Sequence, residues 1–491
     1  MTGNSFLYLT NITLFLIYCF QVSAFGSDAK YSYPSIREEY ADAVCRLDGV
    51  DSAVSGTGGT ICVLDKPISL TDAIRIALKN NPDNQMAVAR IAQAKALIEK
   101  SHAAFYPTLG LYTEYMQGDA PSANFFKTLD QRKFSPGTDF NDPGWFENFE
   151  TGLHGQINLY NGGRDLLTKK MAETGLNINQ LDRRAIENSL VASVVNAYYD
   201  YLAAKDFIEI AKESASTVRT ELEIMQVRLR AGGALKSDVL SLEVRLAQAR
   251  EDVVRSQNQL KMTMAALANL LGVSPDKEIL IKSSRPQPIE VPDDYAAGVA
   301  HALKKRPELT KVREQLKQSR MALDKSGAEY FPSIDLQGRY YHDDPDMSYD
   351  RDRENWTVAM MLNWYFFTGF STRADIKNAS AKIEEILAAD RKTILAVQLD
   401  VKHAYLRLSE AKARLEVAEK SVASAEESLD LVKIQFEGGS ATITRYLEAE
   451  LARNMARIRV TRAFYDREQA FADIGRAIGA LGIMFTQDQD G

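Results

Sequence analysis

The sequence predicts an internally duplicated α+β membrane protein, in which each repeat has two transmembrane β-strands and one long antiparallel helical hairpin. First, apolar residues recur every three or four positions over long stretches, and no proline between Pro143 and Pro275 interrupts them. Second, segments that alternate apolar and polar side chains precede these stretches, as strands with one apolar face do. Third, the second half of the chain repeats the order of the first, which indicates a duplication.

Composition and charge limit the class of protein. The chain has 491 residues, with 59 Lys and Arg against 66 Asp and Glu and a formal net charge of −7. A nucleic-acid partner would select a basic surface, so we expect no nucleic acid to bind.

The N-terminus indicates export. Residues 1–24 carry no charge, and an apolar run from Phe6 to Phe20 ends in the small-residue sequence Val22-Ser23-Ala24. We expect residues 1–24 to be a secretory signal peptide. An uncleaved anchor helix is the alternative, although the run is short for a membrane span.

Residues 25–66 show no clear period and are expected to be an N-terminal extension. They contain Cys45 and Cys62, the two cysteines that remain once the signal peptide is removed. An even pair in an exported chain favours a disulfide between them. Two unpaired cysteines are the alternative.

Repeat 1 is predicted over residues 67–272. Ser69 is expected to cap a first helix, because Asp72 follows three residues later. A second helix leads to Phe105-Tyr106-Pro107, where the apolar period changes from helical spacing to strict alternation. The remaining elements are expected as a strand at about 107–116, a loop at 117–150, a strand at about 151–160 and long helices at about 164–230 and 236–271.

Four prolines within residues 273–292 indicate a linker, and repeat 2 is predicted over 293–483. Ala77-Leu78-Lys79 recurs as Ala302-Leu303-Lys304 at an offset of 225, and Glu243 pairs with Glu450 at an offset of 207. The offset falls because the second loop between strands is shorter, with register kept on both sides. The elements are expected as strands at about 332–341 and 356–366, long helices at about 371–437 and 443–480, and a C-terminal tail at 484–491.

The alternating segments have the length and pattern of membrane strands. A tilted strand of about 9–11 residues crosses a bilayer, with apolar side chains toward lipid and polar side chains toward a water-filled lumen. A soluble sheet packed on a core is the alternative. The side chains expected to line the lumen are His154, Gln156, Asn158, Asp335, Gln337 and Arg339.

The chain supplies too few strands to close a barrel alone. The smallest transmembrane barrels have about eight strands, and lipid does not tolerate unpaired strand edges. We therefore expect copies of the chain to share one barrel as a homo-oligomer.

The duplicated order of two helices, Phe/Tyr-Pro, strand, loop, strand and long hairpin resembles the TolC-like outer membrane factors, and this resemblance runs from Ser69 to Leu481. It implies a homotrimer in the outer membrane of a Gram-negative bacterium, with a twelve-stranded β-barrel in the lipid continued by an α-helical barrel across the periplasm. It also implies an exit duct for drug efflux or type I secretion. The implied partners are a periplasmic adaptor (membrane fusion protein), an inner-membrane RND or ABC transporter, and outer-membrane lipid.

The resemblance also implies roles for the turns between the long helices. It places Gly232, Gly233, Gly438 and Gly439 at the periplasmic tip, in contact with the adaptor. In the TolC-like family, the positions six and nine residues after the glycine of the second turn often carry acidic side chains that constrict the entrance. In this sequence they are Arg445 and Glu448, and Asp238 holds the equivalent of the first position in repeat 1. An ordinary solvated helix face is the alternative for all three.

No catalytic constellation is visible in the sequence. The five histidines are scattered without metal-ligand spacing, and no Gly-rich phosphate loop joins a strand to a helix. We therefore expect neither enzyme activity nor a cofactor or metal. A soluble periplasmic coiled-coil scaffold or adaptor remains as an alternative, and so does an exported enzyme.

Overall fold

A computed structural model describes residues 67–139, 141–277, 279–282, 291–292, 294–348 and 351–481. The expected signal peptide (1–24), the extension (25–66) with Cys45 and Cys62, and the tail (484–491) lie outside the described residues.

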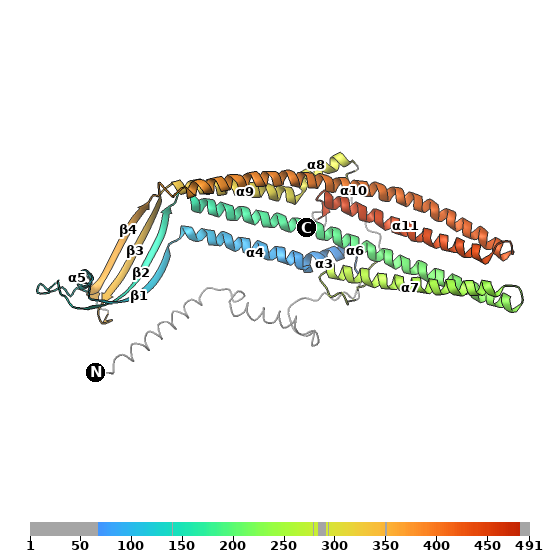
Figure 1. Ribbon diagram of the computed structural model, residues 1–491, viewed down its shortest axis with the longest axis horizontal. Coiled ribbons are helices and arrows are strands. Elements are labelled where there is room, and N and C mark those ends of the chain that lie inside the picture. Colours follow the sequence, from blue (N-terminus) through green and yellow to red (C-terminus); the bar gives the residue numbers. More distant parts are fainter. Residues whose placement is uncertain are drawn as a thin grey trace, which may run out of the picture. The chain divides into compact units, whose positions relative to one another are not determined.

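Two long helical hairpins account for most of the described residues (Figure 1). Helices α6 (Arg164–Arg230) and α10 (Ser371–Glu437) each have 67 residues, and α7 (Lys236–Leu270) and α11 (Ile443–Ala477) each have 35. α6 packs against α7, and α10 packs against α11. A chain without internal proline can sustain helices of this length, because every interior backbone N–H finds its carbonyl partner.

Shorter helices line the strand-proximal parts of α6 and α10. α4 and α9 both pack against α6, and α9 also contacts α10. Ser69 caps the first helix as predicted: the Asp72 N–H donates to Ser69 Oγ at 3.2 Å, and the Ser69 N–H donates to Asp72 Oδ2 at 3.2 Å. These helices are α3 (Leu70–Asn80), α4 (Pro82–His102), α5 (Pro121–Asp130), α8 (Tyr295–Lys305) and α9 (Pro307–Gly327), with short 3₁₀ turns at Ala103–Phe105, Ala328–Tyr330 and Arg351–Arg353.

The apolar stripes seen in the sequence form the core. Val191, Val194, Val195 and Tyr198 of α6 are completely excluded from solvent, and the Tyr198 hydroxyl donates to the Lys282 carbonyl at 2.6 Å. Nearer the turns, apolar residues of both hairpins make a single cluster, which includes Leu222, Leu242, Val432 and Tyr446. Burial of this cluster holds the two hairpins together near their turns.

The four strands form one antiparallel sheet in the order β1-β2-β3-β4. In its register His154 lies opposite Arg339, Gln156 opposite Gln337, and Asn158 opposite Asp335. The six polar residues therefore lie on one face of the sheet, as three cross-strand pairs. The strands are β1 (Thr108–Gly118), β2 (Phe146–Tyr160), β3 (Ser333–Asp344) and β4 (Glu354–Asn363).

The predicted loop at 117–150 was too long. β2 begins at Phe146 rather than at residue 151, and its first residues pair with β1 between Glu114 and Gly118. The helix α5 also lies in this segment, with Pro121 at its start. Proline at the first helical turn is a start signal, but the surrounding glycines and prolines concealed both elements in the sequence.

Two further boundaries differ from prediction. β4 ends at Asn363 rather than at residue 366, because β3 begins at Ser333 and offers no partner beyond that pair. Inside the predicted linker, Ile281 makes a parallel bridge with Ile68, so part of residues 273–292 joins the fold. Among the described helices, none combines the length and the apolar character needed to cross a membrane.

Candidate functional site

The polar face of the sheet presents polar side chains as cross-strand pairs. Asn158 Nδ2 donates to Asp335 Oδ1 at 2.8 Å. The Arg339 guanidinium lies 5.2 Å from the ring centroids of both Tyr112 and Tyr341. A shallow pocket on this face is lined by four of the six residues predicted for the lumen, His154, Gln156, Gln337 and Arg339, together with Tyr112, Glu114, Gly155 and Gly338.

The opposite face is apolar and open. Leu109 is 80% exposed, Trp356 75%, Val358 63% and Met360 68%. Soluble monomers rarely expose so large a contiguous apolar surface, so this face is suited to contact with another apolar phase or surface. Within the described sheet, the outer strands β1 and β4 each have one neighbour, so their outer edges are unpaired.

The turns of the two hairpins have matching geometry. Gly232 and Gly439 both have φ of +77°, a conformation that favours glycine. After each turn glycine, a backbone N–H reaches back to the end of the preceding helix: the Gly233 N–H donates to Arg228 O and the Ser440 N–H donates to Gln435 O, both at 2.8 Å. These bonds satisfy carbonyls that a helix end leaves free.

The predicted gate residues lie just beyond these turns. Asp238 caps α7, because its Oδ2 accepts the Leu235 N–H at 3.4 Å. Arg445 and Glu448 lie in the first turns of α11 with exposed side chains. The structure places Asp238 on one hairpin and the other two residues on the second, and the shared apolar cluster holds these hairpins together.

A buried polar cluster between the hairpins was not predicted. Glu450 of α11 is wholly buried, and its carboxylate accepts from Arg245 Nη2 of α7 at 2.9 Å and from Ser214 Oγ of α6 at 2.7 Å. Asn454 Nδ2 donates to Glu450 and to Ser214 Oγ. The signal was available in the sequence, because Glu450 lies seven residues after Ile443, on the apolar stripe of α11.

A second ionic cluster joins the helices of repeat 2 near their strand-proximal half. Asp400 accepts from Arg306 Nη1 at 2.7 Å and from Arg476 Nη2 at 2.8 Å. Burial alone would raise the pKa of the Asp400 carboxyl, but the hydrogen bonds from Arg476 and Arg306 outweigh it and lower that pKa. Asp400 is therefore a structural anion. Within the described residues, no group of three or more His, Cys, Asp or Glu could hold a metal ion.

Comparison with known families identifies the architecture. The family model described as "Outer membrane efflux protein" matches residues 73–273 and 299–480, which is most of the chain and includes both hairpins. The chain belongs to this family.

Individual relatives agree with the family match. The chain is 28% identical to outer membrane protein OprJ of Pseudomonas aeruginosa over 300 residues, 60% of this chain and 62% of OprJ. It is 23% identical to the pyoverdine export outer membrane protein OpmQ of the same organism over 412 residues, 84% of this chain and 85% of OpmQ. A crystal structure of a membrane protein from Pseudomonas aeruginosa has the same fold, with a TM-score of 0.73 at 23% identity over 83% of this chain and 93% of that one.

Membership of the outer membrane efflux protein family confirms the predicted family, the outer-membrane location and the role as a channel of an efflux or secretion system. Proteins of this family are channels rather than enzymes.

Proposed function

We propose that three copies of this chain assemble into a passive exit duct across the outer membrane and the periplasm. In this assembly, β4 of one copy pairs with β1 of the next, which closes a barrel of twelve strands and leaves no edge in lipid. The observation that carries the proposal is the sheet itself, with one exposed apolar face, one polar face and two unpaired edges.

The duplicated layout supports the rest of the duct. The paired hairpins, with helices of 67 and 35 residues in each repeat, supply a helical wall that continues from the sheet. The α6 helix alone would extend roughly 100 Å at about 1.5 Å per residue. Three such pairs around one axis would enclose a helical barrel, with the hairpin turns at the far end from the sheet.

Membrane fractionation followed by cross-linking tests the assembly. We expect the protein in the outer-membrane fraction, released by detergent but not by high salt, and cross-linked to trimers. A soluble periplasmic scaffold, the second class of function considered, would instead be released by salt. A folded monomer that stays in solution without detergent would contradict the proposal.

The turns are the proposed contact with a periplasmic adaptor, which would couple the duct to an inner-membrane RND or ABC transporter. The α6–α7 turn and the α10–α11 turn lie at the same end of the paired hairpins (Figure 1). The turns contain Gly232, Gly233, Gly438 and Gly439. Because the channel has no energy source of its own in this proposal, transport in either an efflux or a type I secretion system depends on the partner.

The entrance beside these turns is proposed to be narrowed by Arg445 and Glu448, with Asp238 contributing from the first hairpin. Replacing Arg445 or Glu448 with alanine should raise single-channel conductance in planar bilayers, because each change removes a long exposed side chain from the constriction. Arg459→Ala is a matched control, since Arg459 is an exposed arginine farther along α11. Unchanged conductance in both variants would remove these residues from the entrance.

A further inference from the structure

The polar face of β2 is exposed near the helices and covered near the opposite, loop-bearing end. His154 and Gln156 are exposed, whereas Asn148 and Glu150, on the same face, are only 1% and 6% exposed. Asp343, on the same face of β3, is fully buried. Side chains that face an open aqueous lumen would be solvated, so some part of the chain must cover this end of the polar face.

The covering segment is α5 and the residues that follow it. Lys127 Nζ lies 2.7 Å from Glu150 Oε2 and 2.9 Å from Asp343 Oδ1, and thus reaches across β2 to β3. Gln131 Nε2 donates to Asn148 Oδ1 at 2.8 Å and to the Glu147 carbonyl at 2.8 Å. α5 therefore lies on the face that the proposed duct would present to its lumen.

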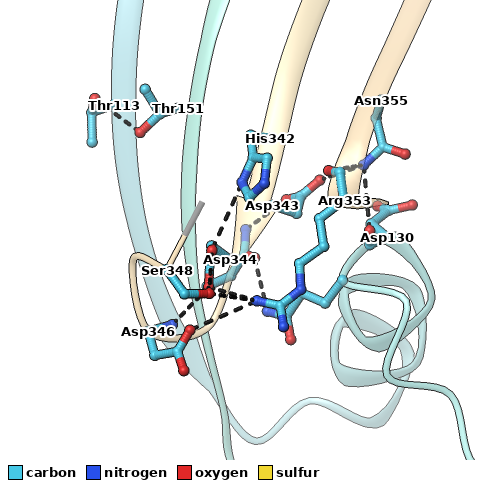
Figure 2. A network of polar contacts seen from close by, with 12 residues as sticks. Thr113, Asp130, Thr151, His342, Asp343, Asp344, Asp346, Ser348, Arg353 and Asn355 are labelled. Atoms are coloured by element: carbon cyan, nitrogen blue, oxygen red, sulfur yellow. Dashed lines mark hydrogen bonds and ion pairs between the residues drawn. The ribbon is translucent and has the colours of Figure 1, made fainter. Parts of the chain in front are cut away.

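The same segment extends to the last strand of the sheet. Arg132 Nη2 donates to Asn355 Oδ1 at 3.1 Å, and Asn355 Nδ2 donates to Asp343 Oδ2 at 3.2 Å. Figure 2 shows Asp343, Asn355 and Asp130 together at this end of the strands, beside the Asp344–Arg353 pair of the β3–β4 turn. The contacts thus run from β2 across β3 to β4.

Glu150 connects the covering segment to the barrel wall. Its Oε1 accepts from Arg339 Nη2 and from the Tyr112 hydroxyl, each at 2.5 Å, while its Oε2 faces Lys127. Burial alone would lower the pKa of Lys127, but its hydrogen bonds with Asp343 and Glu150 outweigh burial and raise that pKa. Lys127 is therefore a permanent cation between two carboxylates, and its ammonium holds α5 down.

We propose that α5 and residues 131–133 form a lid over the outer mouth of the duct, fastened by Lys127 to Glu150 and Asp343, and that this fastening sets the size of solute that passes the mouth. The inference rests on the proposed trimeric duct, in which three lids would surround one opening. It makes Lys127 a determinant of permeability at the end of the duct opposite the hairpin turns.

The rate of cysteine labelling from outside intact cells tests the lid. In a background with Cys45→Ser and Cys62→Ser, Gln156→Cys places a thiol on the polar face, beyond the lid. A small maleimide should label it readily and a bulky polyethylene-glycol maleimide slowly. Adding Lys127→Met should speed the bulky reagent by about 10-fold, because a charge-assisted hydrogen-bond pair that favours the closed position is lost.

Two controls make the outcome specific. Lys133→Met removes an exposed lysine from the same segment and should leave the bulky reagent slow. Lys127→Arg keeps the positive charge, so labelling by the bulky reagent should also stay slow. If the bulky reagent labels Gln156→Cys at the same rate with lysine or methionine at position 127, while the small reagent still reacts, the lid proposal is wrong. The proposal of the duct would not be affected.

Failure of the duct would look different. Met360→Cys, on the apolar face, should resist the small water-soluble maleimide if that face contacts lipid. Labelling of Met360→Cys as fast as Gln156→Cys would contradict the barrel itself, whatever the state of the lid.

Discussion

Replacing Val358 with arginine should abolish the proposed membrane-inserted trimer, whereas the same replacement at the adjacent Ala359 should not. Val358 lies on the apolar face of β4 and is 63% exposed, and Ala359 points to the polar face, opposite Gln337. An arginine on the lipid face of a barrel costs about 2–4 kcal/mol near the bilayer midplane. A trimer would contain three such substitutions, so the cost is paid three times in each assembly.

The measurement is the yield of cross-linked trimer in the detergent-released outer-membrane fraction. Ala359→Arg is a stringent control, because it adds the same side chain one residue away, where it would meet water. Trimer yields that fall equally in both variants would indicate a general folding defect. A normal yield with Val358→Arg would show that the apolar face does not meet lipid.

The two faces of the strands, on which this experiment depends, could be predicted from the alternation of polar and apolar residues in the sequence. Residues 334–340 alternate strictly, and the polar members Asp335, Gln337 and Arg339 do lie opposite the polar residues of β2. Side-chain alternation has period two in any strand, so one face can be read without knowing the partner strand. The bounds of the long helices could also be predicted, because the turn glycines Gly232 and Gly439 interrupt an otherwise continuous helical pattern.

The lid could not be predicted from the sequence in this way. Its position depends on where Lys127 meets Glu150 and Asp343, and Asp343 is 216 residues away in the sequence. A ten-residue amphipathic segment such as α5 can pack on either face of a sheet, and only the tertiary contacts select the polar one. The prediction of a loop at 117–150 rested on Gly and Pro content, which marks turns but does not show where the chain between them lies.

The buried ion pair of Glu450 is the other feature that was not predicted from the sequence. We expect Glu450→Ala to lower the thermal unfolding temperature of the detergent-solubilised protein substantially, since removal of one member of a buried ion pair costs about 3–5 kcal/mol. The loss leaves Arg245, which is only 9% exposed, without its carboxylate, and leaves the Ser214 hydroxyl without its acceptor. Asn454 loses one of its two acceptors and keeps Ser214 Oγ. Unfolding followed by the helical circular dichroism signal measures it.

The internal repeat supplies the control for this prediction. Glu243 is the counterpart of Glu450 in repeat 1, but its side chain is exposed on α7, so Glu243→Ala should change stability by no more than about 0.5 kcal/mol. The double variant Arg245→Met with Glu450→Leu should recover the part of the loss that comes from the unpaired Arg245 charge, because apolar side chains of similar volume can replace a buried ion pair. It should not recover the part that comes from the Ser214 hydroxyl, which still lacks its acceptor. If Glu450→Ala unfolds like the native protein, the pair is not what joins the hairpins, and the apolar cluster around Leu242 and Tyr446 must hold them alone.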